Sequence, residues 1–271
     1  MGREADYVLG THDEEIGRLG LQHRVWQPRV LDAWRRAGFS AGQTLLDIGC
    51  GPGWATLDLA AIVGPTGRVL ALERSRRFLD VLEAECARRG LQQVQTHELD
   101  LDAAPLPATG ASGAWARWIL TFMQHPRDLL ERVKAALAPG AVFVLHEYFE
   151  YASWRLAPRS PEFEEFVEQV MRSWRASGGE PDIGRILPVW LQELGFELRE
   201  LRPLVDVVPA TSTIWQWPKA FVHSGLRRLV DLGQLDAERA RKIATAFAAA
   251  EAAPHTLMVT PAVLEIIAVR R

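Results

Sequence analysis

Three glycines and an acid lie close together in the segment Leu-Leu-Asp-Ile-Gly-Cys-Gly-Pro-Gly, which covers residues 45–53. Gly49, Gly51 and Gly53 can take positive φ angles and carry no Cβ, so backbone N–H groups there can approach a ligand closely. A helix predicted to begin near Trp54 would direct its partially positive end to the same place. The segment therefore predicts a binding loop for a nucleotide-like ligand that carries an anionic group.

The spacing of the glycines separates the kinds of loop that could bind such a ligand. A P-loop would need Gly-Lys-Ser/Thr, and no lysine is present here. A dinucleotide fingerprint would need G-x-G-x-x-G, whereas this loop reads G-x-G-x-G two residues after Asp47. The nicotinamide alternative is therefore the weaker one, and a third alternative is that the glycines only form a tight turn.

The motif from Asp47 to Gly53 closely resembles the first motif of class I S-adenosylmethionine-dependent methyltransferases. The resemblance is to the small-molecule branch, including ubiquinone/menaquinone-type enzymes and other biosynthetic methyltransferases, and it covers residues 42–147 well. It implies S-adenosylmethionine as cofactor, S-adenosylhomocysteine as product, and transfer of a methyl group to an oxygen, nitrogen or carbon atom. The resemblance also implies that Cys50, within the loop, lies beside the cofactor.

Alternating strands and helices should position this loop. Short connections between residues 42 and 147 predict a parallel sheet with crossover helices. We expect an α/β fold with a doubly wound, seven-stranded, mostly parallel Rossmann-like sheet. The predicted strands are 45–48, 68–72, 94–99, 113–119, 142–145, 196–201 and 263–269.

Acids follow two of these strands. Glu73 ends the second strand, and one carboxylate there could accept hydrogen bonds from both hydroxyls of a ribose. The resemblance implies the same role for it, with Arg74 next to it in the cofactor site. It also implies that Asp100, after the third strand, faces the adenine amino group with Leu101 beside the ring. Glu98 and Asp102 are rival acids.

The fourth strand and the N-terminal helices supply further candidates. The resemblance places Arg117 and Trp118 near the methionine end of the cofactor, and it implies that an N-terminal helix closes over the site with Tyr7, Gln22 and His23. A simpler alternative is that His23 makes only a local hydrogen bond. We expect two helices in residues 1–40, the first opened by a Thr11–Glu14 capping box and interrupted at Pro28.

The fifth strand ends in His146-Glu147-Tyr148, in the same crevice as the glycine loop. His146, Glu147 and His23 are therefore candidates for a general base. Adjacent residues of a strand point to opposite faces, so at most one of His146 and Glu147 should face the site, unless the strand has already ended there. Alternatively these side chains only satisfy the strand end, because alignment of the reactants can supply about 7–11 kcal/mol by itself.

Two long connections are predicted to form a helical lid. We divide the chain into an N-terminal helical cap over 1–40, a core over 41–149, 186–204 and 256–271, and lid insertions over 150–185 and 205–255. Helical spacing predicts helices over 161–177, 182–194 (interrupted at Pro188), 218–232 and 236–253. Several of the ten tryptophans fall near these insertions. The predicted substrate pocket contains Trp154, Trp215, Trp217 and Phe221.

Composition limits the partners. The formal net charge of −3 argues against nucleic acid and favours a small-molecule acceptor. No apolar run of about 18 residues predicts a membrane span, and the polar N-terminus predicts a cytoplasmic protein. The dispersed histidines predict no metal site, and both cysteines should be free thiols. A protein or RNA methyltransferase and a non-catalytic cofactor-sensing interaction protein remain alternatives, and the sequence does not decide between monomer and homodimer.

Overall fold

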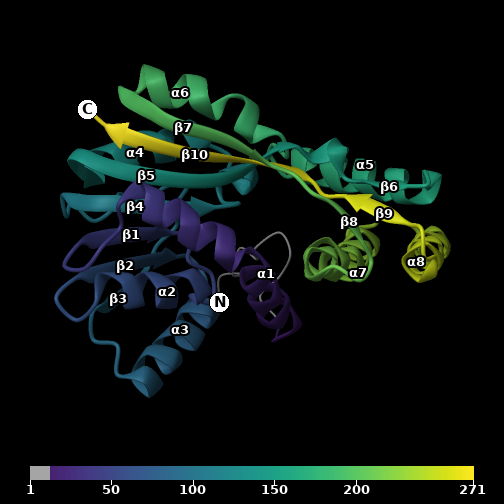
Figure 1. The fold of residues 1–271 in the computed structure, drawn as a ribbon, viewed down its shortest axis with the longest axis horizontal. Coiled ribbons are helices and arrows are strands. Elements are labelled where there is room, and N and C mark those ends of the chain that lie inside the picture. Colours follow the sequence, from purple (N-terminus) through teal and green to yellow (C-terminus); the bar gives the residue numbers. More distant parts are fainter. Residues whose placement is uncertain (1–12) are drawn as a thin grey trace.

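The computed structural model describes residues 13–271 and confirms the predicted α/β fold (Figure 1). Seven strands form one sheet in the order β3-β2-β1-β4-β5-β10-β7. Strand β10 is antiparallel to both β5 and β7, whereas the other neighbours pair in parallel. The strands are β1 (Thr44–Ile48), β2 (Arg68–Glu73), β3 (Val94–Glu98), β4 (Ala111–Arg117), β5 (Leu137–Glu150), β7 (Phe196–Leu204) and β10 (Ala262–Arg270).

The sheet separates two hydrophobic cores because successive strand residues point to opposite faces. Leu45, Trp115 and Val144 pack on one face, whereas their neighbours Leu46 and Leu145 pack on the other. The first face is covered by α1 (Asp13–Ala37), α2 (Trp54–Val63) and α3 (Arg76–Arg89), and the second by α4 (Pro126–Ala136) and α6 (Leu187–Glu193). The doubly wound arrangement follows directly from this alternation.

The predicted break at Pro28 is wrong, because α1 is one helix from Asp13 to Ala37 with Pro28 inside it. Proline removes one helical hydrogen bond, here to the carbonyl four residues earlier on Arg24. Both Pro28 and Arg24 are exposed, so water can hydrate that carbonyl. Trp26 and Val30 are buried on either side of the proline, and their shared face holds the helix on the sheet. Thr11 of the predicted capping box lies outside the described residues.

The later segments form a second group of elements, which we call the insert body. Its three-stranded sheet has the order β6-β9-β8, and its three helices contact one another. The elements are β6 (Arg155–Ala157), β8 (Val207–Pro209), β9 (Leu257–Val259), α5 (Pro161–Ala176), α7 (Gln216–Asp231) and α8 (Ala237–Ala252). The helices were predicted, but the sheet was not, because strands of three residues are too short to show alternation.

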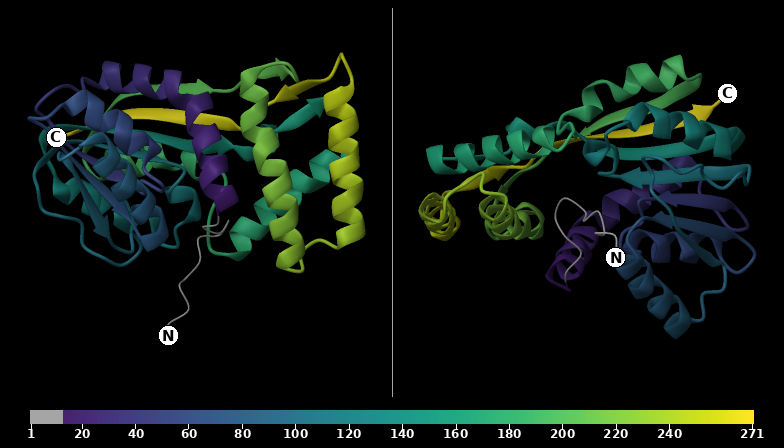
Figure 2. Two further views of the ribbon diagram at one scale, coloured as in Figure 1. Left: turned by 90° about the horizontal axis from the view of Figure 1, so that it is seen from below. Right: turned by 180° about the vertical axis from the view of Figure 1, so that it is seen from behind.

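The insert body lies beyond the carboxyl ends of β5 and β7, and α1 lies between it and the central sheet (Figure 2). Helix α1 contacts both β5 and α7. Short 3₁₀ turns lie in the connections: η1 (Leu120–Phe122) follows β4, η2 (Tyr151–Ser153) follows β5, η3 (Ile183–Arg185) precedes α6 and η4 (Thr213–Trp215) precedes α7. The interruption expected near Pro188 is confirmed, because η3 ends before α6, whose first turn contains that proline. Within residues 13–271, none of the helices has the length and apolar character needed to cross a membrane.

Candidate active site

The glycine loop between β1 and α2 needs its glycines for two separate reasons. Gly49, Gly51 and Gly53 have φ angles of 69°, 54° and 86°, in the left-handed region. A Cβ on Gly49 would lie 2.0 Å from Cδ1 of Ile119, so that position also lacks space. The N–H of Gly49 donates to the carbonyl of Leu72 at 2.9 Å, which ties the loop to β2.

Glu73 is held at the end of β2 by backbone donors. Its carboxylate accepts hydrogen bonds from the N–H groups of Gly51 at 3.0 Å, Arg74 at 2.9 Å and Ser75 at 3.0 Å. Burial raises the pKa of Glu73, and these three donors oppose that rise. The carboxylate is therefore an oriented acceptor beside the loop, not a freely solvated acid at a strand end.

Two adjoining cavities meet at this loop. The larger, which we call the loop cavity, has a volume of about 650 Å³, and its neighbour at the ends of β2 and β3 has about 480 Å³. Both are lined by Gly49 and Glu73. The predicted residues in the loop cavity are Gln22, Asp47, Gly49, Cys50, Gly51, Glu73, Arg117 and Trp118. The neighbour adds Arg74, Asp100 and Leu101. Gly53 precedes α2 as its N-cap, and Tyr7 lies outside the described residues.

A buried acid and a half-buried guanidinium line the loop cavity. Burial raises the pKa of Asp47 to about 7, although the nearby Arg117 charge and a 2.6 Å hydrogen bond from Thr56 lower it. Burial also lowers the pKa of Arg117, to about 10, so its guanidinium remains protonated at neutral pH. Its Nη1 has no hydrogen-bond partner among residues 13–271. The cavity thus offers an acid and a guanidinium nitrogen close together.

His23 connects Arg117 to helix α2. Nδ1 of His23 lies 3.2 Å from Nη2 of Arg117, and Nε2 lies 2.9 Å from Oδ2 of Asp58. Gln27 donates to the same Asp58 oxygen at 2.8 Å. Burial lowers the pKa of His23, which favours a neutral ring that accepts from Arg117 and donates to Asp58. Both ring nitrogens of this candidate base are therefore in use.

A third cavity, of about 400 Å³, has walls made almost entirely of rings. We call it the aromatic cavity. Its aromatic lining residues are Trp118, Phe122, Tyr148, Tyr151, Trp154, Trp174, Trp217 and Phe221. Trp154, Trp217 and Phe221 were predicted for the substrate pocket. Trp215 is not among the described residues that line it, because its ring packs on Phe247 and its Nε1 donates to Glu251 at 2.9 Å, between α7 and α8.

Several residues of this cavity were missed at the sequence level. Tyr151 and Trp174 resemble ordinary core residues in sequence, because nothing local indicates that they face one cavity. Arg18 was missed because a buried cation is uncommon. Its guanidinium is balanced by Glu15 at 2.6 Å and donates to Gln22 at 3.0 Å. The inner side of the first half of α1 is therefore polar.

Trp118 and Gln22 line both the loop cavity and the aromatic cavity. Trp118 has a φ angle of 51°, which is strained for a bulky residue. Its ring stacks between Tyr148 and Trp217, at centroid distances of 5.3 Å and 5.4 Å. These stacks offset the backbone strain and hold the ring as a common wall between the two cavities.

Glu147 lies within a longer strand than was predicted, because β5 continues to Glu150. Its Oε1 accepts the N–H groups of Ile119 and Leu120, both at 2.8 Å. Burial raises the pKa of Glu147 to about 7, while these donors lower it. Glu147 thus fixes the turn that follows β4, and it is not among the described residues that line the three cavities.

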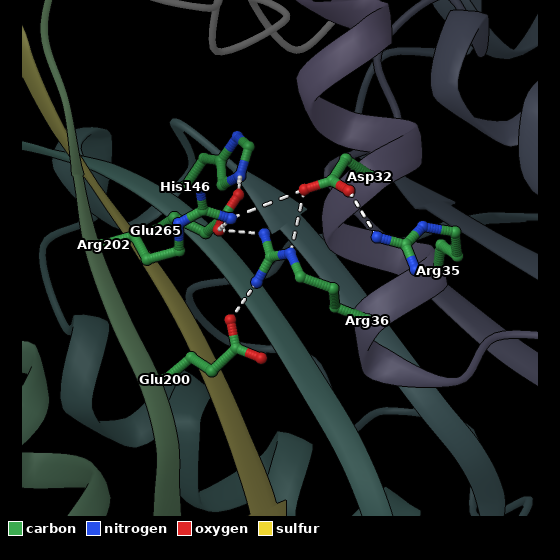
Figure 3. A network of polar contacts seen from close by, with 7 residues as sticks. All are labelled: Asp32, Arg35, Arg36, His146, Glu200, Arg202 and Glu265. Carbon is green, nitrogen blue, oxygen red and sulfur yellow. Dashed lines mark hydrogen bonds and ion pairs between the residues drawn. The ribbon is translucent and has the colours of Figure 1, made fainter.

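His146 belongs to a polar network on the other face of β5 (Figure 3). Its Nε2 lies 2.9 Å from Oε2 of Glu265 on β10, and Glu265 also ion-pairs with Arg36 of α1. The ring packs against Trp26 and Trp115. His146 is not among the described residues that line the three cavities either, so both of these candidate bases have partners elsewhere: His146 on β10, and Glu147 in the turn after β4.

Comparison with known proteins finds a family match for the first part of the sheet, from β1 to the start of β5. Residues 45–140 match the family described as "Methyltransferase domain". A trans-aconitate 2-methyltransferase from Paracidovorax citrulli is 28% identical over 186 residues, covering 68% of this chain and 66% of that protein. The ubiquinone/menaquinone biosynthesis C-methyltransferase UbiE from Ectopseudomonas mendocina is 28% identical over 130 residues, covering 48% and 50%. The chain thus spans less than two thirds of either relative.

Solved structures share the fold. A putative methyltransferase from Bacillus halodurans aligns with a TM-score of 0.59 at 17% identity, covering 89% of this chain and 97% of that one. At this identity the likeness concerns the fold alone. Residues 45–140 of this chain thus match a methyltransferase domain, and the solved structure shares the fold around it.

Proposed function

We propose that this protein transfers a methyl group from S-adenosylmethionine to an oxygen, nitrogen or carbon atom of a small apolar or aromatic molecule. The observation that carries this proposal is the common wall formed by Trp118 and Gln22. On one side lies a polar cavity around a glycine loop, and on the other a cavity of rings. Two adjoining cavities of opposite character suit a charged donor and an apolar acceptor.

The cofactor would extend across the two polar cavities. In this proposal Asp100 and Leu101 hold the adenine, Glu73 the ribose, and Asp47 with Arg117 the zwitterionic methionine end. A carboxylate has about four acceptor positions, and the three backbone donors already use three of them on Glu73. Glu73 can therefore accept one ribose hydroxyl directly, and a second only if the Gly51 N–H moves away.

The aromatic cavity would hold the acceptor. Flat walls formed by Trp118, Tyr148 and Trp217 favour a planar ring, which can stack at low cost in conformational freedom. Ring-containing acceptors also fit the name of the ubiquinone/menaquinone relative. The insert body and α1 enclose the cavity, which supports a small acceptor over a protein or RNA chain. A cytoplasmic location is part of this proposal.

Catalysis would rest on alignment. The sulfonium methyl group must face the acceptor in line, and a dry, fitted site can supply about 7–11 kcal/mol toward that geometry. His146, Glu147 and His23 all have protein partners. We therefore propose that they hold the site in shape, and that an acceptor proton leaves to solvent or to a group on the acceptor itself.

The segments 150–185 and 205–255 would act as the lid, with residues 1–40 as a cap. Support comes from Trp217 of α7, which stacks on Trp118 of the common wall and makes an edge contact with Trp26 of α1. Opening this contact would admit the acceptor, and closing it would exclude water. Hydrogen exchange in both segments should slow when S-adenosylhomocysteine and acceptor are added together, and unchanged exchange would contradict a lid.

The central test is binding followed by transfer. Calorimetry should show that the protein binds S-adenosylmethionine and S-adenosylhomocysteine, whereas nicotinamide dinucleotide should not bind. Incubation with the methyl-labelled cofactor and a small-molecule extract of the producing cells should then label a low-molecular-weight product. Binding of the dinucleotide alone, or label only in protein or RNA, would overturn the proposal.

A further inference from the structure

We propose that Asp58 is a positioning residue that acts through His23 to hold Arg117 against the carboxylate end of the bound cofactor. This inference rests on the proposed function and adds a residue of α2 that faces neither the acceptor nor the glycine loop. Its basis is a chain of contacts across three elements, from Asp58 on α2 through His23 on α1 to Arg117 on β4.

The first step concerns the charge of Arg117. It is a half-buried cation whose Nη1 is fully buried, and among residues 13–271 no carboxylate forms an ion pair with it. Its one hydrogen-bonded neighbour is the ring of His23, and its Nη1 has no partner in that same range. A charged donor atom that is buried without an acceptor is costly. Because Arg117 also lines the loop cavity, an anionic group bound there would supply the missing partner.

The second step concerns the orientation of Arg117. Nη2 contacts Nδ1 of His23 at 3.2 Å, which requires that Nδ1 carry no proton. The 2.9 Å contact from Nε2 of His23 to Asp58 keeps the proton on Nε2. Loss of the Asp58 acceptor would let the ring turn or change tautomer, and Nδ1–H would then face a guanidinium donor. Arg117 would lose its fixed position although the residue itself is unchanged.

The third step concerns Asp58 itself. Burial raises its pKa, but hydrogen bonds from His23 and Gln27 outweigh this and lower it below the ordinary value. Asp58 is therefore ionised at neutral pH and can hold the ring of His23. It is partly exposed and lies on the side of His23 away from Arg117, so its contact with the cofactor site runs through that ring, and its negative charge also favours the Arg117 cation.

The inference is tested with two ligands that differ only at the amino-acid end. S-Adenosylhomocysteine carries the carboxylate, whereas 5′-methylthioadenosine keeps the adenosine and the thioether but lacks it. Calorimetry should show that Arg117→Gln lowers the affinity for S-adenosylhomocysteine by about 10- to 100-fold. This is the range expected for loss of a hydrogen bond to a charged group. Asp58→Ala should lower the same affinity by about 5- to 20-fold. Both variants should bind 5′-methylthioadenosine within about threefold of the original protein.

A double variant separates positioning from a merely structural effect. If Asp58 acts through Arg117, Asp58→Ala should add no further loss in the Arg117→Gln background. Asp80→Ala is the matched control, because Asp80 is an exposed acid on α3 that ion-pairs with Arg76 outside the site. Asp58→Asn should give an intermediate loss, since its side-chain carbonyl can still accept from His23. Circular dichroism and melting temperatures show which variants remain folded.

Each other result overturns the inference. An equal loss of affinity for both ligands in Asp58→Ala would indicate a general structural role. Unchanged affinity for both would show that Asp58 has no role in cofactor binding. A further loss specific to S-adenosylhomocysteine in the double variant would show that Asp58 acts independently of Arg117. If the original protein binds neither ligand, the proposed function itself fails, which is a distinct outcome.

Discussion

The loop cavity and the aromatic cavity share a wall, but the chain builds them in different ways. The loop cavity lies at strand ends. Asp47 lies near the end of β1, and Gly49 follows in the turn after it. Glu73 is the last residue of β2, and Arg117 is the last residue of β4. The aromatic cavity is made by side chains from α1, β5, η2, α5 and α7, which are far apart in the sequence. The first is set by local geometry, and the second by tertiary packing.

This difference indicates which of the two cavities can change in sequence without disturbing the other. The family match ends at residue 140, before every element of the insert body. Substitutions among the aromatic walls would alter the space for the acceptor without moving the glycine loop or the sheet. We therefore expect cofactor binding and acceptor selection to respond to different sets of residues, and the predictions below test that separation.

The largest effect is expected at Gly49, on the loop side. Gly49→Ala would place a Cβ 2.0 Å from Cδ1 of Ile119 at a φ angle of 69°. The loop must shift, and affinity for S-adenosylhomocysteine should fall at least about 100-fold in calorimetry, since strain of this kind costs about 1–3 kcal/mol before any lost contact is counted. Gly17→Ala is the control, because no atom lies within 4 Å of its Cβ position. Binding within threefold of the original would contradict the assigned geometry.

Glu73→Gln should have the next largest effect. The amide keeps the shape of the side chain but loses its charge and one acceptor oxygen, so the three backbone donors and a ribose hydroxyl can no longer all be satisfied. Affinity for S-adenosylhomocysteine should fall by about 10- to 100-fold, as for loss of a charge-assisted hydrogen bond. Glu98→Gln, at the end of the neighbouring strand, should change it little. An equal loss in both variants would implicate overall charge instead.

On the aromatic side, Trp217→Ala should affect the acceptor and not the cofactor. The change removes the stack on Trp118 and the edge contact with Trp26. Once the acceptor is identified, kcat/KM for it should fall by about 10- to 50-fold, as expected for loss of aromatic contact area. Affinity for S-adenosylhomocysteine should stay within twofold. Trp217→Phe should recover most of the rate, and a matching loss of cofactor affinity in Trp217→Ala would show that the two cavities are not separable.

The same contrast explains how much the sequence predicts. The glycine loop, Glu73 and Asp100 could be located from sequence because a strand followed by a turn fixes where its last residues lie. The continuity of α1 could not be predicted from sequence, since whether Pro28 breaks the helix depends on which side of the helix is exposed. The full length of β5 could not either, because its partner β10 lies more than a hundred residues later.

Asp58 and Tyr151 show the second limit of the sequence. A single acid in the middle of α2 and a tyrosine after β5 have no distinctive spacing. They join the site only when α1 packs against α2 and β5, which brings His23 to Asp58 and encloses the aromatic cavity. Helical spacing predicted the insert helices, but it does not show which of their rings point into a cavity. That information depends on contacts between distant segments.

A smaller effect is expected from pH, and again on the loop side. Burial raises the pKa of Asp47 to about 7, so in the free protein the acid becomes neutral below that pH. Because the pKa of Asp47 is raised in the folded protein, its protonated form stabilises the fold most at low pH. This stabilisation is lost as pH rises through 7. A bound ammonium group favours the ionised acid, so affinity for S-adenosylhomocysteine should be about tenfold lower at pH 6 than at pH 8. Asp47→Asn should bind more weakly at pH 8 and lose this dependence; a dependence that persists would assign it to another group.

The smallest effect is expected at His146, although its residue type suggests a base. Burial lowers its pKa, so the ring is neutral near pH 7, and its Nε2 is bonded to Glu265 in the network of Figure 3. His146→Gln can keep a donor to Glu265 while it removes any imidazole that could titrate. We expect kcat with saturating cofactor to stay within about threefold and the pH–rate profile to keep its shape, because alignment and not proton transfer at this residue would supply the acceleration. Some thermal stability should be lost with the ring contacts to Trp26 and Trp115. Loss of an ionisation from the acid side of the profile, with a fall in kcat of about 100-fold or more, would instead make His146 the base.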